Sequence, residues 1–275
     1  MDSKYFNPYT DFGFKKLFIE DDSRGLLVDF LNQLLPAYHQ IAKLQFSNSE
    51  RLNRRIKEST KIYEIYCQTD TGDKFIIELQ KAGVNHFKGR SLFYSTFPTK
   101  DQARNEEWDF KSLPVYFIAI LDFFHDRNNE VRKFKRDINL VDKNAELSSD
   151  NLHFKFLQMP LFDKRSNELE THIDKWVYFL KNLSKLEQVP KALDEPIFIK
   201  AFETTEIAEL TPSQHKEYQA SLFNYWRAKN IKDTAFNEGK LKAKLDVARG
   251  LKQLHVPANI INTATGLTIQ KIESL

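Results

Sequence analysis

The sequence has little cysteine and no long apolar run, and each absence excludes a class of protein. Cys67 is the only cysteine among 275 residues, which excludes an intrachain disulfide framework and a zinc centre built on cysteine ligands. The longest apolar stretch, Leu113 to Phe124, is interrupted by Pro114 and Asp122 and is shorter than the ~18 residues of a membrane-spanning helix. The amino terminus has no basic segment followed by an apolar stretch, so we expect no signal peptide and a cytoplasmic location.

An excess of one charge is also absent. The 41 Lys and Arg residues nearly balance the 38 Asp and Glu residues, giving a formal net charge of +3, which excludes a histone-like polycation but not a local basic groove. Eight Gly and nine Pro exclude a collagen-like or low-complexity chain. Because 41% of the residues are apolar and 23 are Phe, the chain can form a large core, and its length predicts one large domain with a smaller appendage.

The spacing of apolar residues predicts helices, then strands, then helices again. Apolar positions three and four residues apart predict two helices in the first forty residues, the second capped at Asp22-Ser23 and ended by Pro36. Strands are expected at 41–46, 61–69, 74–80, 131–140 and 152–159, and a helix is expected within 83–97. The nearly continuous apolar run at 113–123 predicts a central strand covered on both faces.

After about residue 165 the strand signals fade and helices dominate. They are expected at 173–183, at 197–210, from Pro212 to about Leu254, and as two short helices around Gly266. We therefore predict an α/β body at 1–165 and an α-helical region at 166–275 that ends in a helix-turn-helix-like tail. The tail could read DNA, but packing of its two short helices on the long one is the favoured alternative.

One predicted hairpin carries a pattern that points to chemistry. Asp70-Thr71-Gly72-Asp73 is a tight-turn signal between the strands at 61–69 and 74–80. A three-residue turn centred on Thr71 sets Glu64 directly opposite Glu78. Two carboxylates facing each other in a sheet repel unless a cation lies between them. Mg²⁺ supplies that charge, prefers oxygen ligands and can activate a water beside a phosphodiester.

The same two glutamates have a simpler interpretation. They could be solvent-exposed on the outer face of an edge hairpin, and spacing alone favours this reading because Glu is common on exposed strand faces. A register slip of one residue would also turn Glu64 to the other face. Without further information, the hairpin pattern leaves both alternatives open.

A local basic segment follows the hairpin. Residues 81–100 contain four basic residues, Lys81, Lys88, Arg90 and Lys100, and no acidic residue. Arg90 and Tyr94 are four positions apart and share one face of a helix. A helix of this kind fits phosphate contacts, so we predict Lys81, Lys88, Arg90 and Tyr94 as DNA contacts. The alternative is a solvated basic helix.

Seven segments in order along nearly the whole chain share one resemblance: Tyr5 to Phe18, Leu26 to Leu35, the hairpin at 61–80, Phe87 to Pro98, Leu113 to Phe123, Asp174 to Leu183 and Thr265 to Leu275. Together they resemble the PD-(D/E)XK nuclease family transposases, also called the Rpn or recombination-promoting nuclease family. The resemblance implies an α/β fold with a restriction-endonuclease-like mixed sheet flanked by helices.

The resemblance also implies a site and a cofactor. Family members are thought to cut DNA with Mg²⁺, for which Mn²⁺ can substitute. Their site combines an acidic residue on the first helix, an Asp on the first hairpin strand and Glu-x-Gln on the second. Carried over, Asp11, Glu64 and Glu78 would hold the metal, and Gln80 would orient the attacking water. Asp11 has a second interpretation, since an acidic residue in the first turn of a helix is favoured by capping and by the helix dipole.

Three functional hypotheses follow. The leading one is a Mg²⁺-dependent DNA endonuclease of the recombination-promoting type. The second is a catalytically weak or inactive relative that binds DNA or protein, because Glu64 stands where the family has Asp and Gly89 where relatives often have an acidic residue. The third is an assembly module that forms homo-oligomers through the carboxy-terminal helices.

Overall fold

A computed structural model of the chain describes residues 3–37, 39–46, 64–80, 87–102, 113–123, 133–141 and 147–275. Only the backbone is described at 64, 80, 88, 90, 97–102, 140, 141 and 147–150. The chain divides into two compact units, Met1–Tyr225 and Trp226–Leu275, and the sheet belongs to the first unit. The fold is α/β, with a mixed six-stranded sheet, flanking helices and a long helical region at the carboxy terminus.

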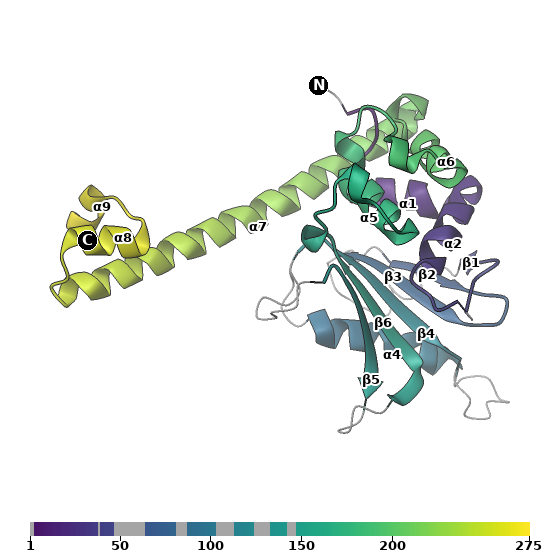
Figure 1. Cartoon of the computed structure of the whole chain (residues 1–275), viewed down its shortest axis with the longest axis horizontal. Coiled ribbons are helices and arrows are strands. Elements are labelled where there is room, and N and C mark those ends of the chain that lie inside the picture. Colours follow the sequence, from purple (N-terminus) through teal and green to yellow (C-terminus); the bar gives the residue numbers. More distant parts are fainter. Residues whose placement is uncertain are drawn as a thin grey trace. The chain divides into compact units, whose positions relative to one another are not determined.

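Six strands form the sheet shown in Figure 1. They are β1 (Gln45–Phe46), β2 (Glu64–Gln68), β3 (Lys74–Gln80), β4 (Val115–Leu121), β5 (Lys135–Val141) and β6 (Leu147–Gln158). Their order is β1-β2-β3-β4-β6-β5, in which β4 runs parallel to both β3 and β6 and the other neighbours are antiparallel. The central strand expected at 113–123 is confirmed as β4, whose seven residues are all buried. The strand expected at 41–46 is shorter than predicted, since only its last two residues form β1.

A short turn joins β2 to β3 and sets their register. The amide of Thr69 donates to the carbonyl of Asp73 at 3.0 Å, and the amide of Gly72 donates to the carbonyl of Thr69 at 3.0 Å. Gly72 has φ +93°, a left-handed conformation that glycine adopts without a steric penalty. The loop therefore consists of the three residues 70–72, as the sequence predicted.

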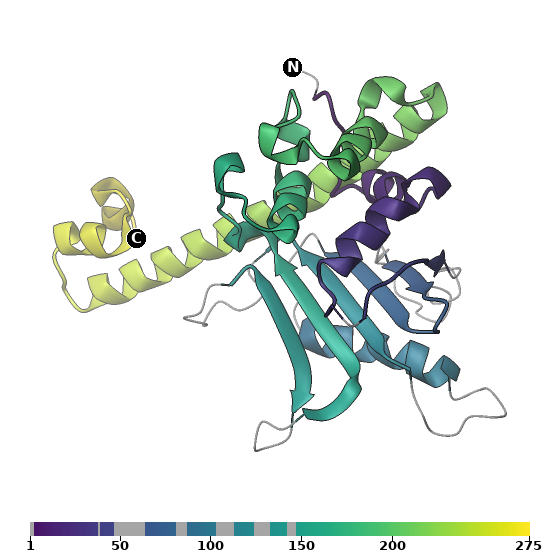
Figure 2. The same ribbon diagram turned by 45° about the vertical axis from the view of Figure 1, so that its right-hand side comes forward.

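Four helices cover one face of the sheet (Figure 2). They are α1 (Asp11–Phe18), α2 (Arg24–Asn32), α5 (His172–Asn182) and α6 (Pro196–Thr205). Their apolar sides form one core with Phe75, Ile77 and Leu79 of β3. Trp176 of α5 is fully buried in this core, and its Nε1 donates to Asp29 Oδ2 of α2 at 2.6 Å. Helices α5 and α6 share the core of the sheet and lie in the first unit.

The start of α1 depends on a close approach that only glycine permits. Thr10 caps the helix, and its Oγ1 accepts a hydrogen bond from the Gly13 amide at 2.9 Å. A Cβ atom on Gly13 would lie 2.3 Å from the carbonyl oxygen of Asn7. Any larger residue at this position would push the preceding segment off the helix.

Helix α4 (Phe87–Gln102) covers the opposite face of the sheet (Figure 1). Its Phe87 and Tyr94 pack against apolar residues that point away from the first core. These residues are Tyr66, Ile76, Phe117, Ala119, Leu121, Phe154 and Phe156. Strands β3 and β4 are therefore covered on both faces, which explains why the β4 sequence is apolar without alternation.

Helix α7 (Pro212–Gln253) closely matches the long helix expected from Pro212 to about Leu254. In the second unit α8 (Ala258–Thr265) and α9 (Ile269–Glu273) pack on it around Ala248, Ile261 and Ile272. The packing alternative for the helix-turn-helix-like tail is thus confirmed. Short 3₁₀ turns lie at Asp21–Ser23, Met159–Leu161, Ser166–Glu168, Leu183–Lys185, Lys191–Leu193 and Ile207–Glu209. Among the helices of the described residues, none is long and apolar enough to cross a membrane.

Candidate functional site

The β2–β3 hairpin brings two glutamate positions together. Glu64 of β2 is the register partner of Glu78 of β3, as the turn geometry predicted. On its other side Glu78 is paired in register with Ala119 of β4. Glu78 therefore stands in the interior of the sheet, between a second acidic position and a small side chain.

The side chain of Glu78 is fully buried, with 0% of its surface exposed. It shares a strand face with Ile76, which packs under α4 in the second core. The edge-hairpin alternative, in which Glu78 faces solvent, is thus wrong. The physical reason is that β4 pairs with the far side of β3, and α4 covers the face from which Glu78 projects.

A buried carboxylate directly opposite a second acidic position fits a hard divalent cation. Burial of a charged group is costly unless an opposite charge or hydrogen bonds compensate it, and facing carboxylates add repulsion. Oxygen donors of this kind are the ligands that Mg²⁺ prefers. Among the described side chains, which do not include those of Glu64 and Gln80, no group of three or more His, Cys, Asp or Glu residues could hold a metal ion.

Asp11 belongs to α1 and not to the hairpin. It is the first residue of α1, and its carboxylate forms an ion pair with Lys15 one turn later, at 3.1 Å. Thr10, not Asp11, is the residue that caps the helix. Helix α1 packs on the sheet face opposite to the one that α4 covers and from which Glu78 projects.

The predicted DNA contacts on α4 need one correction. Tyr94 is only 2% exposed and packs in the second core, so its ring cannot meet a nucleic acid and is removed from the predicted contacts. The spacing rule placed Tyr94 on the face of Arg90, but an aromatic ring on a helix that covers a sheet is more stable buried. Lys88 and Arg90 lie on α4, where only their backbone is described, and Lys81 lies outside the described residues.

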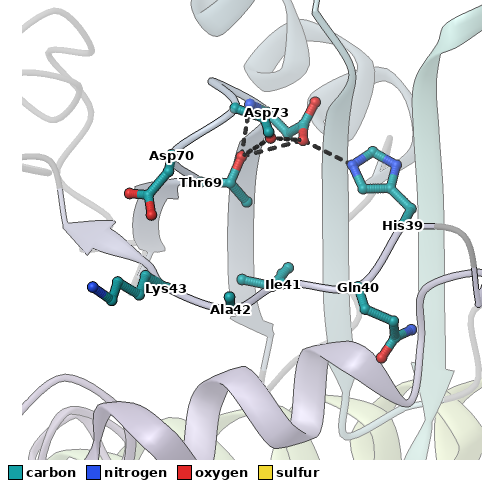
Figure 3. A pocket seen from close by; sticks show the side chains of 9 residues that line it. His39, Gln40, Ile41, Ala42, Lys43, Thr69, Asp70 and Asp73 are labelled. Carbon is teal, nitrogen blue, oxygen red and sulfur yellow. Dashed lines mark hydrogen bonds and ion pairs between the residues drawn. The ribbon is translucent and has the colours of Figure 1, made fainter.

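A cavity of about 390 Å³ lies beside the hairpin turn, and its residues were missed by the sequence reasoning. The buried Asp73 carboxylate accepts hydrogen bonds from Thr71 Oγ1 at 2.7 Å and from Thr69 Oγ1 at 3.2 Å. Figure 3 shows the His39 ring turned toward this carboxylate, with Nε2 at 2.8 Å from Asp73 Oδ2. The other ring nitrogen, Nδ1, is 2.8 Å from the hydroxyl of Tyr116 on β4.

These contacts hold the turn that sets the glutamate register. Burial alone would raise the pKa of Asp73, but the hydrogen bonds from Thr71 and His39 outweigh it and lower the pKa below its usual range. The network links three segments, because His39 precedes Asp73 by 34 residues and Tyr116 by 77 residues. No local signal in the sequence marks such a contact, so the role of His39 becomes visible only in the structure.

Ionisable groups also gather where β4 ends, the edge of a parallel sheet at which α/β proteins bind ligands. Burial raises the pKa of the Tyr9 hydroxyl well above its usual value, and the nearby negative charge of Asp122 adds to the shift. Burial lowers the pKa of Lys181, against the opposing effects of Asp163 and Asp122. Asp122 follows β4 directly, and its charge acts on both Tyr9 and Lys181.

Comparison with known proteins gives one match. The family model of the PD-(D/E)XK nuclease family transposases matches residues 8–235, which include the whole sheet, α4 and the Glu64–Glu78 pair. No curated protein and no solved structure matches the chain.

Proposed function

We propose, from the premise that this chain belongs to the PD-(D/E)XK nuclease family transposases, that it is a metal-dependent DNA endonuclease. The single observation that supports this most directly is the register of Glu64 against Glu78, with the Glu78 side chain fully buried. Family membership makes a nuclease the expected class, and DNA the expected substrate. Glu78 begins the segment that resembles the family's Glu-x-Gln motif, and Glu64 stands where the family has Asp on the first hairpin strand.

Each residue of the proposed site has a distinct role. Glu64 and Glu78 would hold Mg²⁺, or Mn²⁺ in its place, and Asp11 would assist from α1. When bound, the metal supplies positive charge to the scissile phosphate and lowers the pKa of a coordinated water. Gln80, two residues after Glu78 on the same strand face, would orient the attacking water through its amide, which donates and accepts hydrogen bonds without carrying charge.

The DNA would approach beside the first turn of α4, on the side of the sheet from which Glu78 projects. Glu78 projects from this face, and α4 carries Lys88 and Arg90 in its first turn. Basic side chains of this kind position a duplex through its phosphates. Lys81, which directly follows β3, completes the proposed set of contacts.

A plasmid assay tests the proposed function. The purified chain should convert supercoiled plasmid to nicked or linear DNA in Mg²⁺ or Mn²⁺ and should lose this activity in excess chelator. Calorimetric titration with Mn²⁺ gives a second readout that does not depend on turnover, and it should detect at least one site. Failure to nick in either metal, together with no metal binding, would refute the proposal.

One observation favours a second candidate function. Glu64 keeps the carboxylate that the family pattern requires but adds a methylene to the expected Asp, and an error of ~1 Å in placement can cost ~10²-fold in rate. A weak or inactive relative that binds DNA in a salt-dependent way is the resulting alternative. Self-association through the carboxy-terminal helices and a cytoplasmic location remain further proposals, which mass measurement in solution and cell fractionation would check.

A further inference from the structure

The positive charge of this chain is concentrated in its second unit. Residues 226–275 contain nine Lys and Arg and four Asp and Glu, so this unit carries a formal charge of +5. The remaining 225 residues hold 32 of the 41 basic and 34 of the 38 acidic residues, a formal charge of −2. The net charge of +3 is therefore the sum of a slightly acidic first unit, with a charge of −2, and a basic second unit, with a charge of +5.

Part of this charge lies on one side of α7. Residues spaced three and four apart share a face of a helix, and one such set runs along the second unit. It consists of Lys229, Lys232, Phe236, Lys240, Ala243 and Val247, which we call the lysine face. Phe236 is 56% exposed and Val247 is 54% exposed. One acidic residue, Asp233, lies on this face as well, four positions after Lys229 and three before Phe236, so the three lysines leave the face with a charge of +2.

Another side of the same helix is already occupied. Ala248 packs against Ile261 and Ile272, which brings α8 and α9 onto α7. Lys252 donates from Nζ to the carbonyl oxygens of Ile272 at 3.2 Å and Glu273 at 2.7 Å and so caps the end of α9. The tail thus buries one side of the helix, while five of the six lysine-face residues are exposed.

We propose that the lysine face is a second DNA-binding surface, which contacts the phosphate backbone without reading bases. Three lysines along one face match a polyanion in charge. The proposal rests on the proposed function only in taking DNA as the partner. Exposed aromatic rings lie close by, since Lys229 Nζ is 5.2 Å from the centroid of the Trp226 ring and Phe236 lies on the face itself, and such rings can stack on bases.

Two other occupants fit the face less well. If the lysine faces of two copies of the chain packed together, lysines would lie against lysines, and like charges repel. An anionic membrane binds helices that combine a broad apolar face with basic flanks, whereas here Lys232 and Lys240 alternate with Phe236 in the middle of the face. DNA is the partner that the charge pattern favours.

A matched pair of triple variants of the full chain tests the proposal. Lys229→Gln, Lys232→Gln and Lys240→Gln together neutralise the lysine face, while Arg227→Gln, Lys242→Gln and Arg249→Gln remove the same charge elsewhere on α7. Gln preserves helix propensity, and circular dichroism confirms that both variants fold. Binding to a labelled random-sequence duplex of about 30 base pairs is measured by fluorescence anisotropy in chelator, so that cleavage plays no part.

The lysine-face variant should bind at least about tenfold more weakly near 100 mM salt, and its salt slope should fall by ~2 to 3, one for each lost phosphate contact. The control variant should stay within about threefold of the wild type. Equal losses in both variants, or no loss in either, would overturn the proposal. So would wild-type binding to phosphatidylserine vesicles without binding to the duplex. No measurement in this experiment depends on nicking. The binding result would therefore be the same if the proposed nuclease site were inactive.

Discussion

Glu64 on β2 and Glu78 on β3 stand directly opposite each other in an antiparallel register, and the Glu78 side chain is fully buried. Glycine at position 72 and the hydrogen bonds around Thr69 and Asp73 set this register. A buried acidic position that faces another across a sheet is the arrangement expected of a metal-dependent nuclease.

Shortening Glu64 should improve the proposed site. Glu64→Asp restores the residue that the family pattern has at this position, and we expect nicking to become faster by as much as ~10²-fold. Glu78→Asp is the matched control, because it shortens the carboxylate at the position where the family pattern has Glu, and it should slow nicking. The measurement is the single-turnover nicking rate of each variant, compared with that of the wild type. A slower Glu64→Asp variant would mean that this site is built around glutamate.

Asp11 can be tested separately from its ion pair. Asp11→Asn removes the carboxylate and the contact with Lys15, whereas Lys15→Gln removes only the contact, which is 3.1 Å long on the helix surface. Each variant should lose only ~0.3–0.5 kcal/mol of unfolding free energy. If Asp11 assists the metal, Asp11→Asn should lose at least about tenfold in nicking rate while Lys15→Gln keeps it. Equal nicking by both variants would leave Asp11 with a structural role alone.

The turn at Gly72 should be sensitive to substitution. Alanine there must adopt φ near +93°, and its Cβ would lie 2.6 Å from Leu113 Cδ1. We expect Gly72→Ala to lower the free energy of unfolding by about 1–2 kcal/mol. Gly25→Ala in α2, where a Cβ would meet nothing within 4 Å, should be neutral or stabilising by up to about 1 kcal/mol. Urea denaturation followed by tryptophan fluorescence compares them, and similar effects of the two substitutions would contradict the turn geometry.

The Asp73 network should make stability depend on acid pH. Burial opposes ionisation of Asp73, but hydrogen bonds from Thr71 and His39 lower its pKa below the ordinary 3.8. A lowered folded-state pKa contributes stability that is present above the ordinary value and lost as the pH falls through the folded-state value. Asp73→Asn should therefore be less stable than the wild type by about 1–3 kcal/mol at neutral pH, and the difference should shrink below pH 3.8.

The control for this pH dependence is the exposed neighbour in the same turn. Asp70→Asn changes the same group, but Asp70 is exposed and its side chain is 3.4 Å from Gln45 Nε2. Its stability difference from the wild type should be small at all pH values. A flat difference for Asp73→Asn between neutral and acid pH would show that the carboxylate does not titrate as the network requires.

Much of the hairpin could be predicted from local pattern. Phe75, Ile77 and Leu79 alternate along β3, and the turn signal at 70–73 predicts a three-residue loop that places Glu64 opposite Glu78. A slip of one residue was the competing register, and the observed pairing of the two strands excludes it. The long helix from Pro212 and the short helices around Gly266 were also predictable, because their caps and apolar spacing are local.

The burial of particular side chains was not predictable in this way. Whether Glu78 faces solvent depends on the pairing of β4 with β3 and on the packing of α4 over the sheet. Both are contacts between segments that are separate in the sequence. The same helix buries Tyr94, which its spacing from Arg90 alone would expose. His39 reaches Asp73 and Tyr116 only after the sheet has formed, because the three residues come from separate segments.

The most direct test of the central claim is the nicking rate of a Glu78→Gln variant. This substitution keeps the size of the buried side chain but removes its charge, while Glu187→Gln makes the same change at an exposed position. If Glu78 holds the metal, Glu78→Gln should nick plasmid at least about 10²-fold more slowly than the wild type in Mg²⁺, and Glu187→Gln should match the wild type. Both variants should bind a duplex with unchanged affinity in chelator. Wild-type nicking by a folded Glu78→Gln variant would contradict the account.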